Sequence, residues 1–373
     1  MDNLIRDLRF AIRGLLKRPG FSALAISVVA LGAGATAGMF NVLDTMIIRS
    51  LPYDEADRIV TVWEDNAESG LERDDVAPGN FLDWRDQVTS FEKIAAVAPS
   101  TLDYVGNDRA EVIFGASVTE GFFEVMGTQM LSGRDFESGD FKTGAGGVVI
   151  LSYSLWQKRF GGDPDLLGQG LELDGRMYTV VGILPSSFEP HLLPAVGDRE
   201  AWVPLVLEGW EQRIRGSRWW NAVALLKPGI PLQAAQAEMD TISARMAQEY
   251  PDTNKNIRVN LVPLREHLAG NARTALLVLQ GAVSLLFAIA CANLIALFLA
   301  RGAERQRELA VRASLGAQRT SLIRQLLMES GLVALAGGAF GIALAYWGVG
   351  LIAKLAPAEI PRLDQVSVDP RTL

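Results

Sequence analysis

Three long uncharged stretches constrain this sequence more than any other feature. No charged side chain occurs in residues 19–43, 274–300 or 330–353, which are runs of 25, 27 and 24 residues. A helix needs about 20 apolar residues to cross a bilayer, and no other part of the chain meets that requirement. The first run is longer than the about 7–15 residues of a signal-peptide core. We therefore expect three transmembrane helices, the first of them uncleaved.

The basic residues beside these runs predict their orientation, because Lys and Arg gather on the cytoplasmic side of spans. Residues 1–18 contain five basic side chains and the loop 301–329 contains six, whereas the flank 44–60 contains two. We expect 1–18 and 301–329 to be cytoplasmic, with 1–18 an amphipathic helix on the inner surface of the lipid bilayer. The segment 44–273 and the tail 354–373 then lie outside, in a multi-pass protein of the bacterial inner membrane.

The segment 44–273 is predicted to be a large periplasmic α+β domain. Its length also allows two small domains, and its mixed strands and helices also allow the α/β class. Apolar alternation predicts strands at 58–63, 147–151 and 257–262, and a hairpin over 171–183 that turns at Asp174-Gly175. A helix over 232–250 carries Ala235, Met239, Ile242 and Met246 on one face. The segment has 35 acidic and 21 basic residues, a net charge of −14, which excludes nucleic acid as a partner. Its lack of cysteine means that its own core must stabilise it.

Small residues recur at helical spacing in all three predicted spans. Such spacing lets helix backbones approach closely, within one chain or across a dimer, and both alternatives remain open. The predicted helix-packing residues are Gly34 and Gly38 in the first span, Ala288, Ala292 and Ala296 in the second, and Gly337 and Gly341 in the third.

The loop 301–329 has the spacing of two short helices joined by a tight turn. Glu304, Glu308 and Arg312 follow one another at four-residue intervals, and Glu308 is well placed for an ion pair with Arg312. Gly316, after Leu315, is a natural helix stop, and Thr320 or Ser321 can begin the next helix. An ordinary cytoplasmic loop needs no such architecture, so we predict a docking element.

The sequence lacks the motifs of several enzyme and carrier classes. It has no phosphate-binding loop, no zinc-protease motif and no nucleophile elbow, and its histidines, His191 and His267, are far apart. The three spans contain no Asp, Glu, Lys, Arg or His, which argues against an ion-coupled carrier. We therefore predict neither a catalytic site nor a metal site, and expect the energy for any work to come from another protein.

Several motifs resemble one family of membrane proteins. Residues 308–317 (ELAVRASLGA) and 323–330 (IRQLLMES) are similar to the hallmark of FtsX-like ABC-transporter permeases. Residues 8–21 resemble the start of their macrolide-exporter-like (MacB-like) branch, and 291–301 resemble the end of its second span. Within 44–273, residues 80–85 (NFLDWR), 133–136 (GRDF) and 155–162 (LWQKRFGG) resemble the periplasmic core domain of that branch.

This resemblance implies a mechanism of mechanical transmission. The chain would be a permease subunit, not an enzyme, that exports or extracts an unknown substrate. ATP and Mg²⁺ would be bound by a separate ABC ATPase subunit, and this chain would bind no cofactor. The implied ATPase-coupling residues are Arg305, Glu308, Arg312, Leu315 and Gly316. Other implied partners are a second permease copy or half, and a periplasmic adaptor is a further candidate.

The chain departs from the family pattern in having three spans where the basic unit has four. The tail 354–373 resembles the stretch before a fourth span, so the expectation is a fragment, a truncated product or one half of a duplicated permease. The main alternative function is a membrane-anchored envelope scaffold whose 44–273 domain binds a partner protein. A membrane-bound enzyme is a third hypothesis, which the missing catalytic motifs disfavour.

Overall fold

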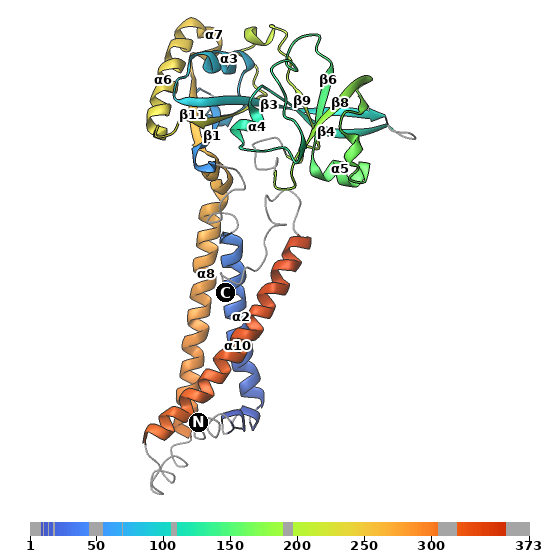
Figure 1. Ribbon diagram of the computed structural model, residues 1–373. Coiled ribbons are helices and arrows are strands. Elements are labelled where there is room, and N and C mark those ends of the chain that lie inside the picture. Colours follow the sequence, from blue (N-terminus) through green and yellow to red (C-terminus); the bar gives the residue numbers. More distant parts are fainter. Residues whose placement is uncertain are drawn as a thin grey trace. The chain divides into compact units, whose positions relative to one another are not determined.

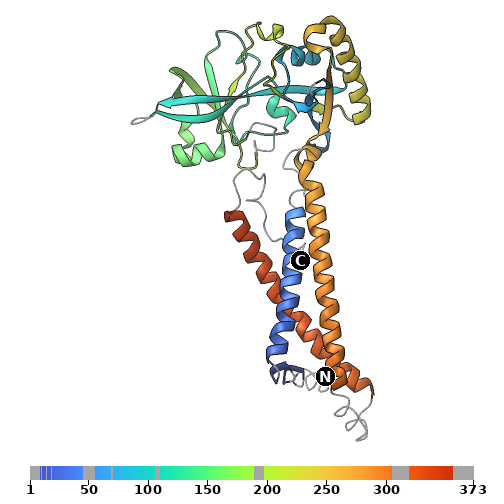
Figure 2. The same ribbon diagram turned by 180° about the vertical axis from the view of Figure 1, so that it is seen from behind.

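The computed structural model describes residues 9–44 except 10, 14 and 18, residues 55–105 except 69, and residues 110–188, 197–304 and 319–355. Its Cα packing divides the chain into two units (Figures 1 and 2). The helical unit comprises 1–49 and 269–373, and the α+β unit comprises 50–268. Apolar helices together with a large α+β domain confirm the predicted fold class.

The helical unit contains three helices that are long and apolar enough to cross a membrane. They are α2 (Pro19–Leu43), α8 (Leu264–Glu304), which begins in the α+β unit, and α10 (Arg319–Leu355). The qualifying stretches are Pro19–Leu43, Arg273–Ala300 and Leu327–Gly348. Of the predicted surface helix, residues 9, 11–13, 15 and 16 are helical, and the rest lies outside the described residues or at the turn before α2.

The α+β unit is built on one eleven-stranded sheet, ordered β11-β1-β10-β3-β4-β9-β6-β8-β5, with β2 beside β1 and β7 beside β3 and β8. The strands are β1 (Ile59–Asn66), β2 (Leu71–Asp74), β3 (Phe91–Val105), β4 (Ala110–Val118), β5 (Ser132–Gly133), β6 (Gly147–Leu151), β7 (Gly170–Leu173), β8 (Arg176–Ile183), β9 (Ala201–Pro204), β10 (Asn221–Leu226) and β11 (Ile257–Pro263). The helices are η2 (Ala56–Arg58), α3 (Pro78–Gln87), α4 (Phe122–Val125), α5 (Tyr153–Phe160), η3 (Pro164–Leu166), η5 (Glu211–Arg213), α6 (Leu232–Glu249) and α7 (Pro251–Asn254).

The long strand β3 joins two halves of the sheet. Its residues 91–97 pair with β10, and residues 97–105 pair with β4. The helices α3 and α6 cover the half that contains β11, β1 and β10, and α5 packs on the half that contains β6 to β8 (Figure 1). A third core, formed around α4 by Phe122, Phe123 and Trp202, lies against the other face.

Local patterns predicted several of these elements correctly. The hairpin is β7–β8, and both turn residues have positive φ, 52° at Asp174 and 68° at Gly175, as a two-residue turn requires. Helix α6 buries Ala235, Met239, Ile242 and Met246, the four residues that its spacing selected. Helix α10 is continuous from Arg319 through the third span, consistent with a helix start near Thr320.

The edge strand β11 is closed on its outer side by a side chain of α6. The amide of Gln236 donates to the Val259 carbonyl oxygen at 2.7 Å and accepts from the Leu261 backbone N–H at 2.9 Å. An amide group presents the same donor and acceptor pair as a neighbouring strand. Gln236 therefore occupies backbone groups that would otherwise invite another strand to pair.

Candidate functional site

The predicted ATPase-coupling residues, Arg305, Glu308, Arg312, Leu315 and Gly316, all lie outside the described residues. The structure describes the two helices that bound this segment. Helix α8 ends at Glu304 and helix α10 begins at Arg319. The coupling assignment therefore stays a prediction.

Glycines hold α2 and α10 in close contact. A β-carbon at Gly34 would lie 2.8 Å from the Gly341 carbonyl oxygen, and one at Gly341 would lie 3.0 Å from the Ala30 carbonyl oxygen. A β-carbon at Gly337 would lie 2.6 Å from the Val29 side chain. Only glycine permits this approach, as expected for small residues between membrane helices. At Gly38, in contrast, an added β-carbon would meet no atom of the described residues of another element within 4 Å.

Helix α8 contacts α2 through aromatic side chains rather than through its alanines. The Phe287 ring packs against Gly32, and the rings of Phe21 and Phe298 meet edge to face with centroids 5.3 Å apart. Ala288, Ala292 and Ala296 are exposed in this single chain. Their predicted packing role is therefore not filled by α2 or α10.

The surface of the helical unit is apolar. Leu31, Leu286, Leu335 and Trp347 each expose more than 60% of their surface. These apolar side chains have no polar group that needs a hydrogen-bond partner. Their exposure therefore suits the hydrocarbon core of a bilayer, which offers no such partners.

A buried carboxylate organises the α+β unit near the start of α3. Glu64 is fully buried on β1, and its Oε1 accepts from the Asn80 side-chain amide at 2.7 Å and from the Ala77 backbone N–H at 3.3 Å. Its Oε2 pairs with Arg218. Ala77 is the N-cap residue of α3 and has no side-chain oxygen to accept a hydrogen bond. Glu64 supplies an acceptor oxygen at this N-terminus instead. Burial raises the pKa of Glu64, against the opposing effects of Arg218 and the hydrogen bonds.

The motif at residues 80–85 contributes to the same network. Asn80 Oδ1 accepts from the Asn254 amide at 2.8 Å and from Arg215 at 3.0 Å. Arg215 also pairs with Asp83 at 2.7 Å and stacks over the Tyr250 ring at 3.7 Å. The motif thus links α3 to α7 and to the segment after η5, which is a structural role.

Sequence reasoning did not select Glu64 or Arg218. One signal was available, since Glu64 is an acid at the end of the apolar run 59–63. A charge there is either the exposed end of a strand or a buried member of a network. The sequence contains nothing that distinguishes these two cases.

A second carboxylate fixes the loop between α3 and β3. Glu238 of α6 accepts from the Thr89 N–H at 2.8 Å, the Thr89 hydroxyl at 2.6 Å and the Ser90 N–H at 2.9 Å. Burial alone would raise the pKa of Glu238, but these hydrogen bonds outweigh it and lower the pKa to about 2.

We expect Glu238→Gln to destabilise the α+β unit by about 1–2 kcal/mol at neutral pH, a value discounted for partial solvent exposure. A lowered folded-state pKa adds stability above the ordinary value of 4.5, and this stability is lost as the pH falls towards 2. The difference between parent and variant should therefore shrink below pH 4.5. Urea unfolding of the full chain at two pH values measures it, with the exposed Glu172→Gln as control. A difference that stays constant with pH would contradict the assignment.

His267 is a partly buried residue that packs against Trp63. Its ring lies 5.3 Å from that of Trp63, and burial, followed by repulsion from Arg73, lowers its pKa to about 4. His191 lies outside the described residues. Within the described residues, no group of three or more His, Cys, Asp and Glu side chains could hold a metal ion.

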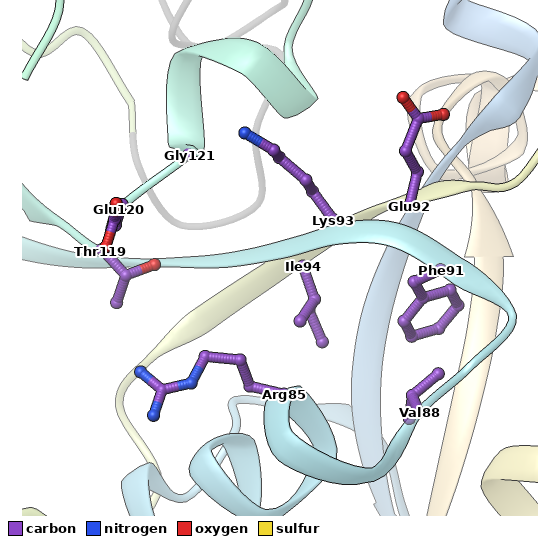
Figure 3. Close-up of a pocket in the computed structure, with 9 residues that line it drawn as sticks. All are labelled: Arg85, Val88, Phe91, Glu92, Lys93, Ile94, Thr119, Glu120 and Gly121. Carbon is purple, nitrogen blue, oxygen red and sulfur yellow. The ribbon is translucent and has the colours of Figure 1, made fainter. Parts of the chain in front are cut away.

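The described part of the α+β unit includes open cavities of about 390–410 Å³. One of about 410 Å³ lies between the end of α3, the start of β3 and the β4–α4 connection (Figure 3). Its lining residues are Arg85, Val88, Phe91, Glu92, Lys93, Ile94, Thr119, Glu120 and Gly121. They are mixed in charge and contain no nucleophile–base pair, which favours binding over catalysis.

Comparison with known proteins links both units to one family. The model of the MacB-like periplasmic core domain matches residues 22–242, and that of the FtsX-like permease C-terminal region matches residues 281–367. The macrolide export ATP-binding/permease protein MacB of Burkholderia pseudomallei is 26% identical over 86% of this chain and 47% of its own length. The probable syringafactin export ATP-binding/permease protein SyfD of Pseudomonas syringae pv. tomato is 27% identical over 61% and 33%. The chain thus spans at most about half the length of these curated relatives.

Solved structures also resemble part of the chain. A domain of a putative permease from Porphyromonas gingivalis has a TM-score of 0.44 and 18% identity, covering 57% of this chain and 92% of that one. The periplasmic region of MacB from Actinobacillus actinomycetemcomitans has a TM-score of 0.40 and 12% identity, with coverages of 56% and 90%.

Proposed function

This chain belongs to the MacB-like, FtsX-like family of ABC-transporter permeases, and on that premise we propose that it transmits ATP-driven motion from a separate ABC ATPase to its α+β unit. The ATPase binds ATP and Mg²⁺ on the cytoplasmic side. The α+β unit, in the periplasm, acts on a substrate that is exported or extracted.

The observation that carries this proposal is the direct connection between the sheet and a span. Strand β11 ends at Pro263, and α8 begins at Leu264 and continues to Glu304, beside the predicted coupling segment. Its one backbone departure from helical geometry is at Gly270. In this proposal, a displacement of α8 at its cytoplasmic end reaches β11 along the continuous chain, through the kink at Gly270, and β11 passes it to its partner β1 inside the sheet.

The lack of charge within the spans supports the same reading. The uncharged runs contain no Asp, Glu, Lys, Arg or His to bind a coupling ion in mid-membrane. Mechanical work by the helices needs no such group. It needs helices that move as packed bodies, and the glycine contacts of α2 with α10 provide that packing.

We propose that Arg305, Glu308, Arg312, Leu315 and Gly316 form the contact with the ATPase. The charged residues pair with side chains of the ATPase, Leu315 packs into its surface, and Gly316 ends the docking helix. A second permease copy or half supplies the partner for the exposed alanines of α8.

Replacing Glu308, Arg312 and Leu315 together by alanine should reduce recovery of the ATPase about tenfold in a detergent pull-down followed by mass spectrometry. The reason is the loss of both charges and the apolar contact at once. A matched control replaces Glu172, Arg176 and Leu131, which are exposed residues of the same types on the α+β unit. If the variant recovers as much ATPase as the control, the coupling assignment is wrong.

A further inference from the structure

Part of β3 has a strand on only one side. From Val97 onward β3 pairs with β4, and the contact extends to Ala96, whose C=O accepts from the Thr119 N–H at 2.9 Å and whose N–H donates to the Thr119 hydroxyl at 2.8 Å. At Gly121, with φ of 84°, the chain turns away into α4. Within the described residues, no strand continues the line of β4 beside residues 91–95 of β3.

Beyond Thr119 this edge of β3 has backbone hydrogen-bonding groups at Ile94 that no strand of the described residues pairs with, although Ile94 as a whole is only 9% exposed. Both backbone groups of Ala96 face Thr119, on the side of β4, and backbone direction alternates along a strand. The N–H and C=O of Ile94 therefore face that same side, whereas those of Lys93 and Ala95 face β10. The cavity of about 410 Å³ lies along this edge, and Ile94 is part of its lining (Figure 3).

The two sides of the cavity differ in chemistry. Arg85 of α3 and Val88, which directly follows α3, lie on the same side of β3 as Phe91 and Ile94, and Lys93 and Glu92 project on the other side (Figure 3). The α3 side is thus apolar with a single cation.

Among the charged residues that line the cavity, Arg85 has the most side-chain nitrogens left to bind a ligand. Lys93 pairs with Glu124, Glu92 with Arg58, and Glu120 accepts from Ser138. The Arg85 side chain is 42% exposed and contacts Asp86, its chain neighbour, through Nε at 3.1 Å. Within the described residues, its two terminal nitrogens contact no acceptor.

We infer that this edge is a docking slot for an extended peptide segment of a partner protein, which adds to β3 beside Ile94 in line with β4 and places an acidic side chain against Arg85. Backbone hydrogen bonds to a sheet edge provide affinity in such binding, and alternate side chains provide specificity. Here every second side chain of the peptide faces the α3 side, where an apolar group contacts the partly buried Val88 above the buried Phe91 and Ile94, and Arg85 donates to a carboxylate. The acidic net charge of the unit acts weakly at this position, because distant charges are screened beyond about 8 Å.

The other side of the slot limits which strands can bind. Lys93, Glu92 and Glu120 surround the open edge with paired charges, as natural edges are protected against indiscriminate pairing. A second copy of this chain would have to present an unpaired strand of its own. The edge strand β11 is already closed by Gln236, and the other edge strands, β2 and β5, have only 4 and 2 residues. These features favour a flexible segment of another protein, rather than a second copy of this chain, as the strand that binds beside Ile94.

The test uses the full chain in lipid nanodiscs, without nucleotide or ATPase, so its outcome is separate from that of the coupling proposal. Linear nonamer peptides are selected from a random displayed library, synthesised with a fluorescent label and measured by anisotropy. We expect binders with an acidic residue flanked at two-residue spacing by apolar ones. Arg85→Glu should weaken their binding about tenfold or more, and Arg176→Glu, a matched exposed arginine of β8, should leave it within about twofold.

Backbone methylation of the peptide tests the strand geometry. Methylating successive peptide nitrogens should weaken binding with a period of two, because alternate N–H groups face β3. Amide hydrogen exchange supplies a second readout, with Ile94 exchanging quickly in the free chain and becoming protected by the peptide. Binders insensitive to Arg85→Glu, the absence of any binder, or a methylation scan without period two would each overturn the inference. So would protection of Ile94 before peptide is added, or protection that rises with protein concentration, which would identify a second copy.

Discussion

Glu64→Leu is expected to lower the free energy of unfolding of the α+β unit by about 3–5 kcal/mol, the usual cost of breaking a buried ion pair from one side. Glu64 is fully buried, so no water can replace it as an acceptor. Its loss leaves Arg218, whose side chain is 12% exposed, without its counterion. The Asn80 amide and the Ala77 N–H lose an acceptor as well, at the N-terminus of α3.

Tryptophan fluorescence during urea unfolding of the full chain measures this effect. Every tryptophan except Trp347 lies in the α+β unit, so the signal reports mainly on that unit. The exposed Glu172→Leu is the control and should change stability by no more than about 0.5 kcal/mol.

A double variant separates the charge from the other lost contacts. Glu64→Leu combined with Arg218→Met removes both charges, and it should recover part of the lost stability because no buried ion remains unpaired. If the double variant is less stable than Glu64→Leu alone, Arg218 is stabilised by groups other than Glu64, and the account of the network is wrong.

Gly341→Leu should disrupt the packing of the helical unit, with a loss of about 3 kcal/mol or more from overpacking. A β-carbon there lies 3.0 Å from the Ala30 carbonyl oxygen and 3.2 Å from the Gly34 nitrogen. These are backbone atoms of α2, so the clash cannot be relieved by a change of rotamer. The helices must separate, and the close contact that small residues allow is lost.

Gly338→Leu is a closely matched control for this change. It lies on the same helix three residues away, and nothing lies within 4 Å of its position for a β-carbon. Helix content followed by circular dichroism during SDS titration compares the two variants, and pull-down of the ATPase shows whether the packing matters for coupling. Equal resistance to SDS would show that α2 and α10 do not depend on this contact.

The glycines of α2 also show what the helical spacing of small residues can predict and what it cannot. Gly34 and Gly38 are selected by the same spacing. A β-carbon at Gly34 would clash with α10, whereas one at Gly38 would meet no described residue of another element within 4 Å. The spacing identifies a side of a helix. It contains no information on where along that side a second helix crosses, because the crossing depends on both helices together.

The sequence by itself determined the features that depend on local physics. Uncharged runs of bilayer length predicted the apolar helices, since the hydrocarbon core excludes charge. The turn at Asp174-Gly175 followed from its need for positive φ, and the buried face of α6 followed from a 3.6-residue period. The family resemblance was carried by short motifs in their order, and the family models confirm it.

Only the tertiary structure decided the features that depend on residues far apart in the chain. Glu64 meets Asn80 and Arg218 only because β1, α3 and the segment after η5 come together, at sequence separations of 16 and 154 residues. The open edge at Ile94 exists because β4 leaves β3 at Thr119, which no periodicity in either strand records. Local patterns specify which face of an element is buried, whereas pairing and the places where pairing stops arise from the packing of the whole sheet.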